Sequence, residues 1–254
     1  MVASRIRLCA GLLAAALVMV AAGACDDGAG SPIPTQQPAV TIGPETQNVG
    51  LPVEDGDGFV TLRGHLFGPQ HRTGVILTHM RPNDQSVWFD FAQELADNGY
   101  AAFTFDFRGY GETGGDQDFD KLDDDVLTAI EYMRNLEGID EVFLIGASMG
   151  GTAALVAAAE EPVDGVIAIS PPAEFEGLDA VDAVSSITAP KLFVASVDDE
   201  EAIGFQDLLD AASQPVDSET YTGNAHGTNL LLSEHGDALR ALILQFLQEN
   251  SSPE

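Results

Sequence analysis

Val142-Phe143-Leu144-Ile145-Gly146-Ala147-Ser148-Met149-Gly150-Gly151 is an apolar run that ends in a Gly-x-Ser-x-Gly string, and an alanine-rich stretch follows it. The apolar run is typical of a buried strand and the alanine-rich stretch of a helix. A serine on a tight turn between the two needs glycine two residues before and two residues after, because a Cβ at either place would collide with neighbouring backbone. The stretch therefore predicts a nucleophile elbow, with Ser148 as the nucleophile and Gly146 and Gly150 as the elbow glycines.

Two later segments supply the groups that a serine nucleophile needs. A histidine must take the hydroxyl proton, and a carboxylate must orient that histidine. Asp198 and Asp199 follow the apolar run 191–195, and His226 follows the run 219–221. Because sites in α/β sheets form beyond the carboxyl ends of the strands, Asp199 is predicted as the acid and His226 as the base. Asp198 is the alternative acid, and a simple helix cap is the alternative role of the acidic cluster.

The chain order Ser, Asp, His resembles that of the α/β-hydrolases, from about residue 50 to the end. In that family the strand before the first sheet-covering helix typically ends in His-Gly-x, and here the segment is His79-Met80-Arg81. The resemblance implies an oxyanion hole formed by the backbone amides of Met149 and Arg81, with Met80 as the alternative to Arg81. It also implies that His79 orients the oxyanion loop and is not the general base.

A further stretch, from Asp106 to Thr113, resembles the family's Asp-x-Arg-Gly-x-Gly-x-Ser segment. In the family this segment is generally structural and braces the loops beside the elbow. Three of the five histidines remain, two near a first hairpin and one at a helix start. These are predicted as surface residues: His65, His71 and His235.

Beyond residue 48, apolar and β-branched runs alternate with segments of helical period. This pattern is typical of a mostly parallel sheet with helices on both faces. The predicted fold class is therefore α/β, and the resemblance implies an α/β-hydrolase with a twisted sheet of about seven or eight strands. Strands are predicted at 59–67, 74–78, 101–105, 142–145, 165–169, 191–195 and 219–221, and helices at 85–98, 118–138, 151–160, 200–212 and 234–250.

Many α/β-hydrolases carry a helical cap between the strand after the elbow helix and the strand that bears the acid. Here only Ser170 to Pro190 lies in that position, and prolines within it limit helix length. We therefore expect little or no cap domain and an open site, with Phe175 and Leu178 at its edge. An open site favours varied or bulky acyl substrates with modest selectivity.

The amino end predicts export. Residues 1–24 combine arginines, an apolar stretch and small residues, which is typical of a signal peptide. Small residues that end at Cys25 resemble the lipobox of bacterial lipoproteins, so Cys25 is the predicted lipidation site, on the outer face of the membrane. The alternatives are an ordinary cleaved secretory signal and an uncleaved anchor, with no lipid on Cys25. Residues 25–47, rich in Gly, Pro, Thr and Gln, are predicted as a flexible tether, and residues 48–254 as a single domain.

Composition excludes several classes of function. A formal net charge of −31 repels nucleic acid and makes self-association unfavourable, so a monomer that does not bind nucleic acid is expected. The only cysteine besides Cys25 is Cys9, inside the predicted signal, so the domain has no disulfide or thiolate site. The run 116–120 alternates oxygen ligands as an EF-hand does, but Lys121 and Leu127 stand where the required glycine and glutamate should be. No metal and no cofactor are implied.

The resemblance implies a serine hydrolase that cleaves carboxylic esters through an acyl-enzyme. The substrate would be a small molecule or another acyl ester. A peptidase, a thioesterase or a cofactor-free haloperoxidase would use the same three residues. The alternative from another class is a non-catalytic surface lipoprotein that binds a ligand in the same cleft, motivated by the predicted anchor and by Met80 in place of glycine.

Overall fold

The structure, a computed structural model, describes residues 46–56 and 58–252. The predicted signal peptide, the predicted lipidation site at Cys25 and nearly all of the predicted tether lie outside the described residues. The tether prediction ends one residue late, because Gln47 already belongs to the first strand. Within the described part, none of the helices combines the length and apolar character needed to cross a membrane.

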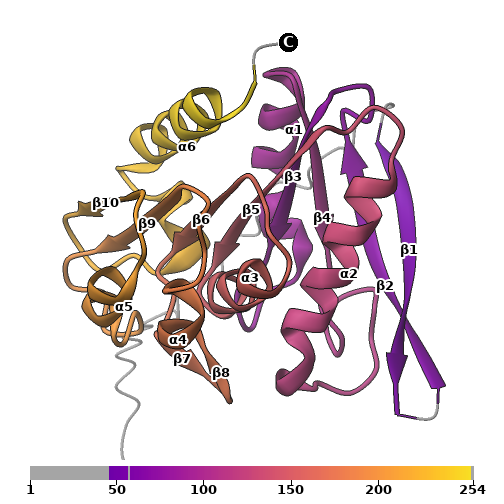
Figure 1. Ribbon diagram of the computed structural model, residues 1–254, viewed down its shortest axis with the longest axis horizontal. Helices are drawn as coiled ribbons and strands as arrows, with labels where there is room; N and C mark the ends of the chain where they lie inside the picture. Colours follow the sequence, from indigo (N-terminus) through magenta and orange to yellow (C-terminus); the bar gives the residue numbers. More distant parts are fainter. Residues whose placement is uncertain (1–45, 57, 253–254) are drawn as a thin grey trace, which may run out of the picture. The chain divides into compact units, whose positions relative to one another are not determined.

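An eight-stranded sheet forms the centre of the domain, in the order β1-β2-β4-β3-β5-β6-β9-β10 (Figure 1). Neighbouring strands are antiparallel at β1–β2 and β2–β4 and parallel everywhere else. This confirms the prediction of a mostly parallel sheet of seven or eight strands. The strands are β1 (Gln47–Asp55), β2 (Gly58–Phe67), β3 (Thr73–Thr78), β4 (Tyr100–Phe105), β5 (Glu141–Ala147), β6 (Gly165–Ile169), β9 (Lys191–Ser196) and β10 (Val216–Tyr221).

Helices cover both faces of the sheet, so the central strands are buried on both sides. Alternate residues of a strand point to opposite faces. Phe143 and Ile145 therefore pack with α1 (Phe89–Asp97) and α6 (Gly236–Asn250), whereas Leu144 packs with α2 (Leu122–Asn135) and α3 (Met149–Glu160) on the other face. The shorter α5 (Phe205–Ala211) contributes Leu208 to this second face.

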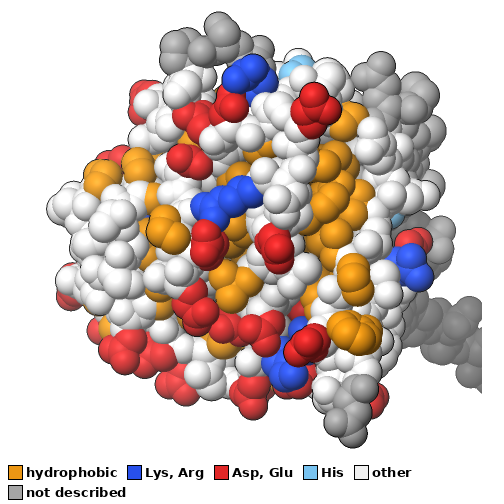
Figure 2. Space-filling model, turned by 45° about the vertical axis from the view of Figure 1, so that its right-hand side comes forward, with side chains coloured by type: hydrophobic (Ala, Val, Ile, Leu, Met, Phe, Trp, Pro, Cys, Tyr) orange, Lys and Arg blue, Asp and Glu red, His pale blue; other side chains and the backbone are white. Residues whose placement is uncertain are grey.

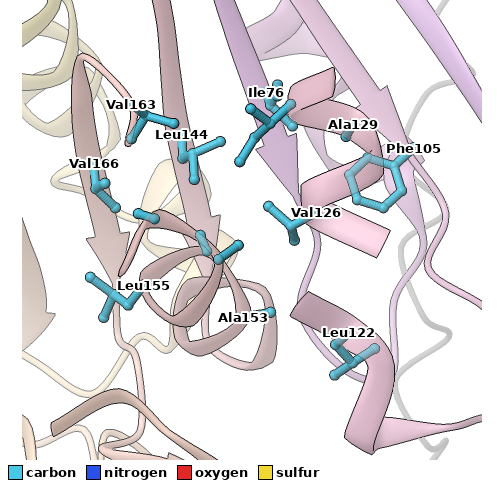
Figure 3. Close-up of a cluster of buried hydrophobic side chains, with 14 of the residues drawn as sticks. Ile76, Phe105, Leu122, Val126, Ala129, Leu144, Ala153, Leu155, Val163 and Val166 are labelled. Carbon is cyan, nitrogen blue, oxygen red and sulfur yellow. The ribbon is translucent and has the colours of Figure 1, made fainter. Parts of the chain in front are cut away.

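Figure 3 shows how the second face is filled. Leu122, Val126 and Ala129 of α2 lie on the side of that helix that faces the sheet, at helical spacing. Ala153 and Leu155 come from α3, which is buried along almost its whole length and is built from small residues. Small side chains let this helix lie close to the strands, which fixes the place of its first residue beside the end of β5.

The segment between β6 and β9 contains little structure of its own. It forms a two-stranded hairpin, β7 (Glu174–Phe175) with β8 (Leu178–Asp179), and the short helix α4 (Ala180–Val184). The prediction of little or no cap domain is confirmed. Leu178, however, was wrongly placed at the edge of a cleft, because it is buried and packs in the core, while Phe175 stays partly exposed.

Candidate active site

The elbow lies where β5 ends and α3 begins. Ser148 has φ 49° and ψ −121°, a conformation that costs a non-glycine residue about 1–3 kcal/mol and is typical of functional positions. Its backbone N–H donates to the carbonyl of Ile169 at 2.8 Å, which ties the turn to the end of β6. The strained turn thus brings the serine side chain to the carboxyl edge of the sheet.

Both elbow glycines are required by close backbone approach. A Cβ at Gly146 would lie 2.4 Å from the carbonyl oxygen of Gly150. A Cβ at Gly150 would lie 2.6 Å from the carbonyl oxygens of both Thr78 and His79. These distances are too short for any side chain, so the spacing Gly-x-Ser-x-Gly follows from the packing of the elbow against the end of β3.

His226 lies within hydrogen-bond distance of both Ser148 and Asp199, the other two residues of the predicted catalytic triad. His226 Nε2 is 2.7 Å from Ser148 Oγ, and His226 Nδ1 is 2.9 and 3.0 Å from the two carboxylate oxygens of Asp199. The side chains of His226 and Asp199 are only 9% and 2% exposed. Since a carboxylate can only accept, Nδ1 carries the proton and Nε2 is left to accept the serine hydroxyl.

The environment of Asp199 keeps its carboxyl group charged. Burial alone would raise the pKa of Asp199, but the hydrogen bond from His226, together with the nearby Ser170 hydroxyl, holds the pKa below its ordinary value. Ser170 is fully buried at φ 51°, close enough to act on the carboxyl group although its hydroxyl has no partner at regular hydrogen-bond geometry among the described residues. The only sequence signal for Ser170 was its place directly after a predicted strand.

Asp198, the alternative acid, does not contact His226. It is exposed, and its backbone N–H donates to the carbonyl of Gly223 at 2.9 Å. The carboxylates do not cap a helix either, because α5 begins only at Phe205. Instead, Asp199 Oδ1 accepts the backbone N–H of Glu201 at 3.1 Å, which closes a local turn around the acid.

Three backbone amides are candidates for the predicted oxyanion hole. Within residues 46–56 and 58–252, those of Met80, Arg81 and Met149 donate no hydrogen bond. They are therefore free to bind the oxygen of a tetrahedral intermediate, and Arg81 and Met80 both remain candidates beside Met149.

Met80 occupies the place where the family usually has glycine, and its side chain is buried. Its sulfur accepts the hydroxyl of Thr228 at 3.4 Å, and a Cβ at Gly227 would lie 2.5 Å from it. The side chain thus fills the space beneath the loop that carries His226. The methionine side chain therefore supports that loop from below.

Both ring nitrogens of His79 are engaged in hydrogen bonds with the backbone. Its Nε2 accepts the backbone N–H of Phe107 at 3.2 Å, so Nδ1 carries the proton and donates to the carbonyl of Met80 at 3.1 Å. Burial lowers the pKa of His79, which keeps the ring neutral. The geometry fits the predicted role of an orienting residue beneath the oxyanion loop.

His65 was wrongly predicted as a surface residue. It is buried, and its Nδ1 donates to Gln85 Oε1 at 3.0 Å. Gln85, in the short helix η1 (Gln85–Trp88), also donates from Nε2 to Asp106 Oδ2 at 2.9 Å. The hydroxyl of Thr104 donates to the same glutamine oxygen at 2.9 Å. Because each buried polar group finds a partner, this network fixes the start of the Asp106 segment.

Arg108, in the segment resembling the family's bracing motif, forms a buried ion pair that the sequence analysis missed. Its Nε and Nη2 donate to Asp125 Oδ1 at 3.0 and 2.6 Å, and its backbone N–H donates to Asp125 Oδ2 at 3.0 Å. The two side chains are 2% and 0% exposed. Asp125 lies on the apolar stripe of α2, between Leu122 and Val126. This position in the sequence could have indicated that Asp125 is buried.

Asp125→Ala is expected to destabilise the protein by about 3–5 kcal/mol, because it leaves the Arg108 guanidinium buried without its main partner. Urea unfolding at neutral pH measures this change. Asp124→Ala on the same helix is the control, since Asp124 is exposed and its loss should cost roughly 0.5 kcal/mol or less. Equal effects of the two substitutions would contradict a stabilising role for the pair.

Charged groups also line a groove that does not include the triad residues. This groove, of about 840 Å³, lies between α2 and the end of β1 and contains charged groups of both signs. Among the described residues there is no group of three or more His, Cys, Asp or Glu side chains suited to hold a metal ion. We therefore place the candidate active site at Ser148, His226 and Asp199.

The sequence profile of the family described as serine aminopeptidase, S33, matches residues 69–204, more than half of the chain. The chain belongs to the serine aminopeptidase S33 family. The match includes the oxyanion segment, the elbow and Asp199, and ends before His226. Together with the sheet topology, membership in the S33 family makes the protein a hydrolase of the α/β-hydrolase fold.

Relatives of this S33 member include proteins from two bacterial genera. An uncharacterized protein of Mycobacterium tuberculosis strain H37Rv, Rv2307c, is 24% identical over 247 residues, which cover 87% of this chain and 84% of that protein. The uncharacterized protein YfhR of Salmonella typhimurium is 32% identical over 85 residues. That match covers 33% of this chain and 29% of the Salmonella protein.

Solved structures share the fold at low sequence identity. The Pyrococcus furiosus esterase Pf2001 superimposes with a TM-score of 0.70 at 17% identity, over 82% of this chain and 92% of the esterase. Est1E from Butyrivibrio proteoclasticus with bound ferulic acid gives 0.68 at 18% identity, over 80% of this chain and 98% of Est1E. A monoacylglycerol lipase of Paleococcus ferrophilus gives 0.64 at 17% identity, over 75% and 99% of the two chains.

Proposed function

We propose that this protein hydrolyses carboxylic esters through a serine acyl-enzyme. The observation that carries the proposal is the continuous hydrogen-bond chain from the Ser148 hydroxyl through His226 to the Asp199 carboxylate, at 2.7 and 2.9 Å. These three groups supply a nucleophile, a base and an orienting acid in the geometry that acyl transfer requires.

The reaction would proceed in two halves. Ser148 Oγ forms a bond to the ester carbonyl carbon while His226 Nε2 takes the hydroxyl proton. The carbon–oxygen bond to the leaving alcohol then breaks, and His226 returns the proton to that alcohol. In the second half, water attacks the acyl-enzyme, gives its proton to His226, and releases the carboxylic acid as Ser148 Oγ regains a proton. One water is consumed for each ester.

Electrostatic interactions would lower the activation barriers of both half-reactions. The ionised Asp199 stabilises the positive imidazolium that forms on His226 in each half-reaction. The amides of Met149 and of Arg81, or alternatively Met80, would donate to the negative oxygen of the tetrahedral intermediate. One such donor typically contributes about 3–4 kcal/mol to transition-state stabilisation.

Ester cleavage is favoured over other acyl transfers by two observations. The structures of similar fold described above are an esterase, a ferulic acid-bound Est1E and a monoacylglycerol lipase. In addition, the short segment between β6 and β9 adds no large cap over the site. Peptide cleavage is the second candidate, because the family description is that of a serine aminopeptidase.

A substrate panel tests the proposal. The purified protein would be assayed with 4-nitrophenyl esters of increasing acyl length, with matched thioesters and with aminoacyl 4-nitroanilides. We expect ester turnover with the highest kcat/KM and covalent labelling by a fluorophosphonate. A higher kcat/KM for the anilides than for the esters would show that the protein is a peptidase instead. A protein that cleaves no substrate and takes no label would be a binding protein, which rejects the proposal.

Export with a lipid anchor remains a prediction from the amino-terminal sequence. The proposed esterase would then act outside the cytoplasm, held to the membrane through Cys25 and the 25–47 tether. The mass of the mature amino-terminal peptide tests this, since a diacylglyceryl group at Cys25 is expected and an unmodified peptide would reject lipidation.

A further inference from the structure

The side chain of Arg81 joins three segments that lie far apart in the sequence. Its guanidinium carbon lies 5.2 Å from the ring centre of Phe175 in β7 and 5.7 Å from that of Phe119 in η2 (Phe119–Lys121). The two rings pack edge to face, with their centres 5.6 Å apart. Arg81 Nη1 also donates to Glu176 Oε1 at 3.4 Å. A single cation is therefore held between two aromatic rings and one carboxylate.

This cation lies beside the candidate active site. Arg81 is the residue whose backbone amide is proposed to bind the oxyanion, so its guanidinium is no farther from that amide than the length of its own side chain. Burial raises the pKa of Tyr110, and the positive charge of Arg81 opposes this, as a nearby charge must. The Tyr110 hydroxyl in turn contacts the sulfur of Met149 at 3.6 Å, and Met149 directly follows Ser148.

The ion pair between Arg81 and Glu176 is weak enough for another carboxylate to displace Glu176. The two side chains are 49% and 50% exposed and share one long contact. Exposed pairs of this kind are typically worth about 1 kcal/mol or less. A substrate carboxylate could therefore replace Glu176, and it could accept two parallel N–H bonds from the planar guanidinium.

The backbone conformation of Glu176 is a further sign that this residue has a functional role. Glu176 and Gly177 form the two-residue turn of the β7–β8 hairpin, with φ 48° and 104°. Turns of this kind favour Asn, Asp or Gly at the first position, so glutamate is strained there. Strained residues cluster at sites that contact ligands. Here the strained turn places the Glu176 carboxylate next to the guanidinium of Arg81.

We propose that Arg81 makes this protein selective for esters that carry a carboxylate, such as hemiesters of dicarboxylic acids. Glu176 is the internal anion that occupies the guanidinium before substrate binds. Phe119 and Phe175 fix the cation and offer apolar contact to the carbon chain of the substrate. With a net charge of −31, the rest of the surface repels anions, so an anionic substrate needs a local cation. The inference rests on the proposed esterase function.

A pair of esters of equal length tests the inference. The kcat/KM for 4-nitrophenyl hemiadipate is divided by that for 4-nitrophenyl hexanoate, at one ionic strength and with the Ser148→Ala rate subtracted. Glu176→Gln removes the competing anion and should raise this ratio about fivefold. Arg81→Gln removes the cation and should lower the ratio about tenfold. Because the two variants are expected to move the ratio in opposite directions, general damage to the site cannot produce both results.

Glu174→Gln is the matched control. It removes the same charge from the same hairpin, at an exposed residue that forms no ion pair within the described part of the chain, and should leave the ratio unchanged. The inference is overturned if Glu176→Gln behaves as Glu174→Gln does, or if Arg81→Gln keeps the wild-type ratio. If the wild type cleaves the hexanoate but shows no such pattern, only this inference fails. If it cleaves neither ester and takes no fluorophosphonate label, the proposed function fails, and this inference with it.

Discussion

Ser148→Ala should lower kcat/KM for ester hydrolysis by about 10⁴- to 10⁶-fold, because it removes the only atom that can form the acyl-enzyme. The His226 imidazole, 2.7 Å from the missing oxygen, would have no hydroxyl to deprotonate. Covalent labelling by a fluorophosphonate should disappear as well. Initial rates with a 4-nitrophenyl ester and intact-protein mass spectrometry measure the two effects.

Ser218→Ala is the control for this variant, since Ser218 is an exposed residue on the edge strand β10. Its activity and labelling should match the wild type. Ester turnover that persists in Ser148→Ala at wild-type rate would show that hydrolysis does not pass through this serine. Thermal unfolding of both variants would confirm that the comparison is made between folded proteins.

Asp199→Asn is expected to lower kcat by about 10³- to 10⁴-fold while leaving KM within a few-fold of the wild type. The asparagine amide can donate to His226 Nδ1, which would move the ring proton to Nε2. Nε2 could then no longer accept the serine proton. The loss of a carboxylate whose pKa is held low also removes the charge that stabilises the imidazolium.

Asp198→Asn separates this effect from a general change of charge. It alters the neighbouring residue by the same amount, at an exposed side chain that does not contact His226. We expect nearly wild-type kcat for Asp198→Asn. A larger loss of kcat in Asp198→Asn than in Asp199→Asn would show that Asp199 is not the acid.

Much of the fold could be predicted because the central strands are buried on both faces. Such strands are continuous apolar runs, and runs of this kind are visible in a single sequence, as at β5 and β9. The meeting of Ser148, Asp199 and His226 was predictable for a related reason. Each follows the carboxyl end of a parallel strand, and all such ends lie at the same edge of the sheet.

Elements at the rim of the sheet were harder to predict. Strand β1 was missed because Gly50 and Pro52 interrupt it and most of its side chains are exposed, as an edge strand allows. The helix predicted from residue 200 begins at Phe205, because the preceding segment folds around the Asp199 carboxylate. The helix propensity of residues 200–204 gave no sign that this segment would form a turn around the Asp199 carboxylate.

Long-range partners of polar groups were also missed. His65 and Gln85 lie 20 residues apart, and nothing in either segment shows that they will pair. Ser170 and Glu176 have backbone conformations that glycine would be expected to fill. Their roles depend on neighbours that come from other strands, so only the folded chain reveals them.

Hydrogen bonds hold the segment that carries the proposed acid, Asp199, next to the loop that carries the proposed base, His226. The loops after β9 and β10 are joined by hydrogen bonds from Ser196 Oγ to the carbonyl of Ala225 at 2.6 Å and from the Asp198 amide to Gly223. β10 is one of the two edge strands of the eight-stranded sheet and the last of its strands to be synthesised. Ser148 is therefore synthesised before His226, and the proposed nucleophile meets its proposed proton acceptor only after this last strand has docked on the sheet.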